Sequence, residues 1–292
     1  MPADGGFPIL TPRFSILSVR EALEQGTRIL EEGGVAVPRL TSEVLLCHAL
    51  GKEKTYLYSH PDVPLTELAW IHFGRYLNER LQGKPTQYIT RRQEFYSREF
   101  RVSPDVLIPR PETEHVVETA LRFLGPESKV ADIGCGSGAI AVSLSLERGV
   151  AVCATDISTR AIAVARDNAS RLGARVAFAV ADVLDAFRPR SLDLIVSNPP
   201  YVALDEKPSM QREVRDFEPE IALYGGESGN EIYRRLIEGA ERVLVPGGRI
   251  VFELGWRSLD PVRAMFGPRW SEIDAAADLS GIPRALTARY DE

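Results

Sequence analysis

Four consecutive residues, Asn198-Pro199-Pro200-Tyr201, combine groups that can hold a planar amino group. The side-chain oxygen of Asn198 and the backbone carbonyl of Pro199 can each accept one N–H bond. Consecutive prolines restrict the backbone, so these acceptors keep their positions with little conformational entropy left to lose. Tyr201 offers a flat face to an amide or a base. Because such nitrogens are poor nucleophiles, the pattern predicts catalysis by aligning the nitrogen with an electrophilic carbon.

A second motif, DIGCGSG at residues 132–138, follows one apolar run and opens a helical one. Alternate glycines let the backbone turn tightly and approach a ligand. Asp156, followed by Ile157, ends the next apolar run, where a carboxylate can accept both hydroxyls of a ribose. Asp182, followed by Val183, ends the third run and suits an adenine amino group. A glycine-rich turn can also merely pack a helix on a sheet, but the two acids favour a nucleotide site.

The spacing of this loop indicates which nucleotide it binds. It reads G-x-G-x-G, whereas pyrophosphate binders carry G-x-G-x-x-G. The acidic Asp132 beside the loop disfavours a phosphate and tolerates a cation. Both features favour S-adenosyl-L-methionine, a sulfonium nucleoside, over NAD. The product would then be S-adenosyl-L-homocysteine. The three cysteines and four histidines lack the paired spacing of a zinc site, so we predict no metal.

These arguments give two sets of candidate residues. The candidate catalytic residues are Asn198, Pro199, Pro200 and Tyr201. The candidate cofactor-binding residues are Gly134, Cys135, Gly136, Ser137, Gly138, Asp156, Ile157, Asp182, Val183 and Asn198. A double-proline segment alone would more simply be a rigid turn after a strand. At the end of a strand that follows this glycine loop, we predict that it is catalytic.

Short apolar runs alternate with helical patterns from residue 129 to the end, with room for seven strands. This alternation predicts an α/β fold with a doubly wound, mostly parallel sheet over residues 111–292. Residues 1–84 read as a small bundle of helices over 18–32, 38–50 and 65–82. Between them, residues 85–110 read as a linker, with a β-hairpin over 86–102 and a stiff proline-rich connector.

Composition limits the class of protein. The chain has 292 residues, 44% of them hydrophobic and 26% charged, with a net charge of −6. These values fit about two folded domains and exclude a disordered, collagen-like or disulfide-rich chain. The negative charge argues against a chain-wide nucleic-acid surface. Met1–Leu10 does not resemble a signal peptide and no apolar run reaches membrane-spanning length, so we expect a cytoplasmic protein that contacts no membrane. We also expect a monomer, a state that no motif in the sequence determines.

Four segments together resemble the PrmC/HemK family, the protein-(glutamine-N(5)) methyltransferases of peptide chain release factors. They are LIPRPETEHVVE at 107–118, DIGCGSG, NPPY, and DFEPEIALYGGESGNEIYRRLI at 216–237, and the likeness extends over roughly residues 20 to 290. The resemblance implies a class I methyltransferase with a Rossmann-like sheet. It implies methylation of the glutamine in the Gly-Gly-Gln loop of release factors.

The same resemblance maps the family's cofactor positions to residues 134–138, Asp156, Val183 and Asn198, and its substrate clamp to residues 198–201. It gives the N-terminal bundle and the hairpin a role in docking the release factor. The sequence departs from the family at Val183, where an aromatic residue is frequent, and near Thr90, where glycine is usual.

Two other functions stay open at this point. A nucleobase amino-methyltransferase of DNA or RNA shares the N-P-P-Y motif, and it would bind nucleic acid with a steep salt dependence. A nucleoside-binding module without catalysis would bind the ligand but transfer no methyl group. The net charge of −6 argues against the first, and the intact motif argues against the second.

Overall fold

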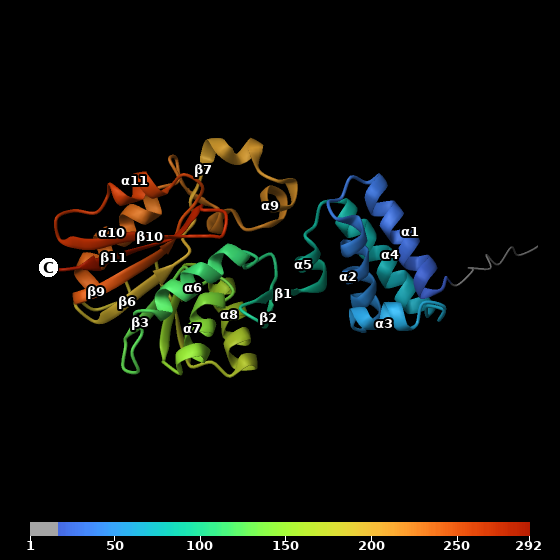
Figure 1. Cartoon of the computed structure of the whole chain (residues 1–292), viewed down its shortest axis with the longest axis horizontal. Coiled ribbons are helices and arrows are strands. Elements are labelled where there is room, and N and C mark those ends of the chain that lie inside the picture. The colour runs from blue at the N-terminus through green and yellow to red at the C-terminus, as the bar shows by residue number, and fades with distance from the viewer. Residues whose placement is uncertain (1–16) are drawn as a thin grey trace, which may run out of the picture. The chain divides into compact units, whose positions relative to one another are not determined.

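The computed structural model describes residues 17–292 (Figure 1). The Met1–Leu10 segment, and with it the start of the predicted N-terminal domain, lies outside the described residues. The chain forms two compact units that divide between Thr90 and Arg91. In the part of the chain that the structure describes, no helix has both the length and the apolar character needed to cross a membrane.

The first unit is helical, with a buried centre that includes Leu23, Leu30, Leu45, Leu46 and Phe73. Its elements are α1 (Val19–Glu32), α2 (Pro38–Leu50), α3 (Lys54–Ser59), α4 (Glu67–Leu81) and α5 (Thr86–Thr90). The three predicted helices correspond to α1, α2 and α4, with α4 shorter than expected at its start. The short helix α3 was not predicted.

The hairpin predicted over residues 86–102 is wrong in its first part. Residues 86–90 form α5, in which the Thr90 hydroxyl donates to the Thr86 carbonyl at 3.1 Å. Tyr88 and Ile89 are buried there, and α5 packs on α2 and α4. Burial has therefore overridden the strand preference of these aromatic and β-branched residues. The hairpin itself is β1 (Arg92–Phe95) with β2 (Arg98–Arg101), and it belongs to the second unit.

The second unit is built on a seven-stranded sheet with the order β10-β11-β9-β6-β3-β4-β5. β11 pairs antiparallel with both β9 and β10, whereas the other four strand pairs are parallel, so the predicted doubly wound, mostly parallel fold is confirmed. The strands are β3 (Val130–Ile133), β4 (Val152–Asp156), β5 (Val176–Val180), β6 (Leu192–Ser197), β9 (Leu244–Glu253), β10 (Trp270–Ala277) and β11 (Pro283–Tyr290). Two short strands outside this sheet, β7 (Val202–Ala203) and β8 (Tyr224–Gly226), pair in parallel.

Helices cover both faces of the sheet, as Figure 1 shows. They are α6 (Glu114–Leu121), α7 (Ala139–Arg148), α8 (Thr159–Leu172), α10 (Glu231–Val243) and α11 (Leu259–Arg263). The short helix α9 (Arg212–Phe217) buries no residue and lies away from the sheet in Figure 1. The 3-10 turns are Pro111–Thr113, Leu204–Ser209 and Glu220–Ala222. Successive strand residues enter opposite cores: Leu194 and Val196 pack with α6, α7 and α8, whereas Ile195 packs with α10 and α11. This two-residue period is the one expected of a sheet buried on both faces.

The topology explains why distant motifs meet. Strands β4 and β5 extend the sheet on one side of β3, and β6 lies on the other side. Because these four strands are parallel, their carboxyl ends lie at one edge, where the strand order reverses. The glycine loop, Asp156, Asp182 and Asn198 all follow these strand ends.

Candidate active site

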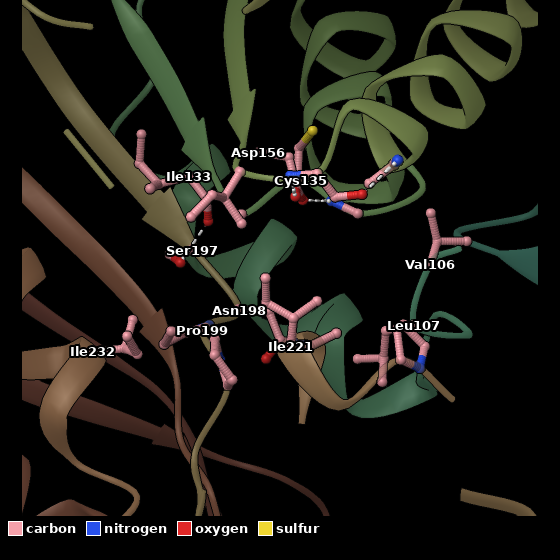
Figure 2. Close-up of a pocket in the computed structure, with 18 of the residues that line it drawn as sticks. Val106, Leu107, Ile133, Cys135, Asp156, Ser197, Asn198, Pro199, Ile221 and Ile232 are labelled. Carbon is pink, nitrogen blue, oxygen red and sulfur yellow. Dashed lines mark hydrogen bonds between the residues drawn. The ribbon is translucent and has the colours of Figure 1, made fainter. Parts of the chain in front are cut away.

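A cavity of about 340 Å³ opens at this edge of the sheet (Figure 2). Most of the predicted site residues line it: Gly134, Cys135, Gly136, Ser137, Asp156, Ile157, Asp182, Val183, Asn198, Pro199 and Pro200. Gly138 and Tyr201 are not among the residues that line it. The topology thus brings together motifs that the chain separates.

The glycine loop is shaped by left-handed backbone angles. Gly134, Gly136 and Gly138 have φ of 71°, 52° and 81°, a region that side chains with a Cβ rarely adopt. A Cβ on Gly134 or Gly136 would meet no other atom within 4 Å, so the backbone here is open to a ligand. A Cβ on Gly138 would instead lie 3.1 Å from the Cβ of Ala165, so this glycine serves the packing of α7 on α8.

Asp156, at the end of β4, holds the loop and faces the cavity. Its Oδ2 accepts the N–H of Gly136 at 2.9 Å, and its Oδ1 accepts the N–H of Ser158 at 2.8 Å. A carboxylate has about four acceptor sites, so each oxygen retains capacity for a ligand hydroxyl. Burial raises the pKa of Asp156, although these backbone N–H groups favour its charged form.

Asp132 and Cys135 are buried residues in and beside the glycine loop. The Asp132 carboxyl is fully buried; its Oδ2 accepts the N–H of Ala141 at 3.0 Å, and its Oδ1 has no partner. Burial raises the pKa of Asp132 to about 7, so near neutral pH the predicted negative charge is only partly present. The sulfur of Cys135 points away from Asn198 and Pro199 in Figure 2, and burial raises the pKa of its thiol, which does not suit a nucleophile.

The third strand end carries Asp182 and Val183. Asp182 is half-exposed, and its Oδ2 accepts a hydrogen bond from Arg235 of α10 at 2.7 Å, which leaves Oδ1 for a ligand. Val183 has φ of 47°, which is unusual for a β-branched side chain. Arg235 also lines the cavity, and no local sequence pattern predicts its pairing with a residue 53 positions away.

Asn198 projects from the end of β6, and its side-chain amide is anchored on one side only. Its Nδ2 donates to the hydroxyl of Thr113 at 3.2 Å. Within residues 17–292, its Oδ1 accepts no hydrogen bond and remains available to a ligand. The strand end beneath it is fixed because the Ser197 hydroxyl donates to the carbonyl of Ile133 at 2.7 Å. Figure 2 shows Asn198 and Pro199 across the cavity from Asp156.

The segment after the double proline is supported by glycines. A Cβ on Gly225 would lie 2.4 Å from the carbonyl oxygen of Pro200, and one on Gly229 would lie 2.4 Å from that of Tyr201. Only glycine allows these two backbones to approach so closely. The Tyr201 ring packs beside Gly255, and burial raises the pKa of its phenol, so Tyr201 stays neutral.

Part of the wall comes from segments that residue types alone did not single out. The connector before α6 contributes Val106, Leu107 and Pro109, and the 3-10 turn near α9 contributes Ile221 (Figure 2). Arg110 and Glu218 join these segments: their side chains meet at 2.5 Å, and the N–H of Ile108 donates to the same carboxylate at 3.4 Å. The contact spans 108 residues of sequence, which no local pattern reveals.

The charges of the cavity indicate what could occupy it. Its acidic and basic lining residues are three aspartates, Asp105, Asp156 and Asp182, and one arginine, Arg235, which is already paired with Asp182. No unpaired cation is therefore offered to a phosphate by the described lining residues. The open backbone at Gly134 and Gly136 and the free acceptor sites of Asp156 suit a ribose. These features fit a cationic nucleoside such as S-adenosyl-L-methionine.

Comparisons with known proteins agree with this fold and show the family. Residues 21–90 match the PrmC N-terminal domain family, and residues 114–214 match the methyltransferase small domain family. A release factor glutamine methyltransferase of Koribacter versatilis is 42% identical over 277 residues, covering 94% of this chain and 99% of that protein. One from Nitratidesulfovibrio vulgaris is 41% identical, covering 91% of this chain and 93% of that protein.

Among solved structures, a methyltransferase from Pyrococcus furiosus has the same fold. It superposes with a TM-score of 0.52 at 20% identity, and the match covers 67% of this chain and 90% of that one.

Proposed function

The chain belongs to the family of release factor glutamine methyltransferases, and on this premise we propose that it methylates the side-chain amide nitrogen of a glutamine in peptide chain release factors. The acceptor we propose is the glutamine of their Gly-Gly-Gln motif. The methyl donor we propose is S-adenosyl-L-methionine, with S-adenosyl-L-homocysteine as product. The observation that carries the proposal is the free Oδ1 of Asn198 beside a nucleoside-sized cavity.

Each proposed cofactor contact uses a group described above. Asp156 would accept the ribose hydroxyls, the open backbone at Gly134 and Gly136 would lie along the nucleoside, and Asp182 Oδ1 would accept the adenine amino group. When bound, the cofactor would supply an electrophilic methyl carbon on a positively charged sulfur. The cavity carries more carboxylates than cations, which favours binding of that charge.

The protein's role in the transfer is positional. Asn198 Oδ1 and the Pro199 carbonyl would each accept one N–H of the glutamine amide, directing its nitrogen at the methyl carbon. The glutamine nitrogen would gain its methyl group as the S–C bond of the donor is lost, and that nitrogen would then give up a proton to water. Alignment of this kind can supply roughly 7–11 kcal/mol of the barrier. Tyr201 stays neutral, so it would not exchange a proton in the reaction.

We also propose that the helical unit helps to dock the release factor. Support comes from exposed apolar side chains on two of its helices, Val37 just before α2, Leu40 in α2, and Leu68 and Ile71 in α4. We place the reaction in the cytoplasm, a location supported by three unpaired cysteines, Cys47, Cys135 and Cys153.

The direct test uses purified protein, methyl-labelled S-adenosyl-L-methionine and a release factor. We expect one methyl group on the acceptor glutamine, located by tandem mass spectrometry, and none on a release factor in which that glutamine is alanine. A parallel incubation with DNA and RNA tests the nucleobase alternative. Label on nucleic acid, or on the protein at another residue, would contradict the proposal.

A further inference from the structure

We propose that Thr113 and Glu253 are positioning residues that fix the orientation of the Asn198 amide and thereby make the site select a carboxamide over a carboxylate. The inference rests on the proposed function, because it concerns how the same site recognises glutamine. It assigns a role to two buried side chains that act through Asn198, one of which, Thr113, also lines the cavity.

A chain of hydrogen bonds links the three residues. The Nδ2 of Asn198 donates to Thr113 Oγ1 at 3.2 Å, and Thr113 Oγ1 donates to Glu253 Oε2 at 2.5 Å. Thr113 ends the 3-10 turn before α6, and Glu253 ends β9, so three separate elements converge here. Thr113 is 4% exposed and Glu253 is 2% exposed, so water does not compete for either contact.

The hydrogen-bond chain has a direction when Glu253 is ionised, because its last member can then only accept. An ionised Glu253 has no proton to donate, so the single hydroxyl proton of Thr113 must point to it. The Thr113 hydroxyl oxygen then presents lone pairs to Asn198, so the group of Asn198 that faces it must be the NH₂ donor. An oxygen in that place would face another acceptor. The Oδ1 of Asn198 is therefore turned toward the cavity.

Without this chain of hydrogen bonds, nothing described around Asn198 would distinguish the oxygen of its side-chain amide from the nitrogen. The amide oxygen and nitrogen of an asparagine have nearly the same size, and only hydrogen-bond partners decide which way the group faces. Among the described residues, Thr113 is the only side chain that hydrogen-bonds to the Asn198 amide. Thr113 does not use its hydroxyl to cap α6, which begins one residue later. The hydroxyl is therefore committed to the chain.

The surroundings of Glu253 allow the ionised form. Arg284 and Arg110 favour its negative charge, whereas Glu112 and burial oppose it. Together they raise the pKa of Glu253 to about 7, so the carboxyl is largely ionised above that pH. Tyr201, which also faces this carboxylate, stays neutral and does not add charge.

The orientation of Asn198 determines which substrates fit. A glutamine amide donates to Oδ1, whereas a glutamate carboxylate would bring an oxygen against an oxygen. A site built around one polar partner rejects an analogue that leaves its groups unpaired. If the Asn198 amide could flip, its NH₂ would donate to a carboxylate oxygen, and this selection would be lost.

The test compares Thr113→Val, which removes the hydroxyl at equal size, with Thr113→Ser, which keeps it. Thr119→Val is the matched control, because Thr119 is also buried, lies in α6, and has a hydroxyl without a partner. For each variant, kcat and KM are measured with a release factor, and the dissociation constant of S-adenosyl-L-homocysteine is measured by calorimetry. Inhibition is measured with a release factor that carries glutamate at the acceptor position.

We expect Thr113→Val to lower kcat/KM by about ten- to a hundredfold, as expected for losing one buried polar partner. It should also bind the glutamate-containing release factor more tightly relative to the glutamine-containing one. Thr113→Ser should restore both properties, and Thr119→Val should match the wild type. The dissociation constant of S-adenosyl-L-homocysteine should change little in all three.

Glu253→Gln provides a second, independent variant if Thr113→Val does not fold. A glutamine there can accept from Thr113 or donate to it, so the direction of the chain is lost and the discrimination should fall. Wild-type discrimination in the folded variants would overturn the inference, as would equal losses in Thr113→Val and Thr113→Ser. A wild type that methylates no release factor would instead contradict the proposed function.

Discussion

Replacement of Asp156 by alanine should weaken cofactor binding more than any other single change at the nucleoside end of the cavity. Each carboxylate oxygen already accepts one backbone N–H, from Gly136 at 2.9 Å and from Ser158 at 2.8 Å. The remaining acceptor sites are those we assign to the two ribose hydroxyls. Hydrogen bonds to a charged group contribute about 1.5–3 kcal/mol each, so losing two costs about 3–6 kcal/mol. That corresponds to about a hundred- to ten-thousandfold in the dissociation constant.

The assay is titration calorimetry with S-adenosyl-L-homocysteine. The matched control is Asp167→Ala in α8. The exposed carboxylate of Asp167 forms an ion pair with Arg101 at 3.0 Å, and Asp167 does not line the cavity. Asp182→Ala should weaken binding less, because Asp182 is half-exposed and shares its charge with Arg235. A denaturant titration of each variant checks that the protein is still folded when the glycine loop no longer has its hydrogen bond to Asp156. Unchanged affinity in a folded Asp156→Ala protein would refute the ribose assignment.

Three further predictions test the surroundings of the site. Burial raises the pKa of Glu253 from 4.5 to about 7, so the contribution of Glu253 to stability is lost as pH rises between these values. Relative to Glu253→Gln, the wild type should lose about 3 kcal/mol of unfolding free energy across that window. An equal change of unfolding free energy with pH in the two proteins would contradict this. Tyr201→Phe should keep wild-type activity, whereas Tyr201→Ala should lower kcat/KM by about three- to tenfold, as for loss of an aromatic contact. Equal rates of methyl transfer by the two variants would show that the aromatic ring at this position does not contribute to activity. Gly225→Ala places a Cβ 2.4 Å from the carbonyl oxygen of Pro200, so kcat should fall with little change in cofactor affinity. In the control variant Gly267→Ala, the added Cβ meets no atom within 4 Å, so this variant should behave as the wild type. Similar kcat values for both variants would show that the close approach of Gly225 to Pro200 does not matter.

The alternation of strands and helices after residue 129 was sufficient to predict the sheet and the edge at which the motifs meet. This works because every parallel strand ends at the same edge, so residues after strand ends become neighbours whatever the strand order. The glycine loop, Asp156 and Asn198 were identified by this rule, and all of them except Gly138 of the loop line one cavity. Glycines at positive φ also carry a direct local signal, since no other residue adopts that backbone readily.

The parts that could not be predicted depend on contacts between distant residues. The helix at Thr86–Thr90 forms because Tyr88 and Ile89 are buried by other helices, whereas their local preference is for a strand. The bond between Thr113 and Glu253 spans 140 residues, and a threonine before a helix gives no hint of such a partner. Likewise, the spacing of the glycines did not reveal that Gly138 packs against Ala165 behind the cavity.

The central claim is that Asn198 orients the acceptor amide, and a single-turnover experiment on Asn198→Ala tests it most directly. With cofactor and release factor both saturating, the rate of methyl transfer should fall by about a hundredfold or more, the loss expected when a reacting group is misplaced. The dissociation constant of S-adenosyl-L-homocysteine should stay within about tenfold of the wild-type value. Transfer at the wild-type rate would contradict the account, because the amide nitrogen would then reach the methyl carbon without the oxygen of Asn198.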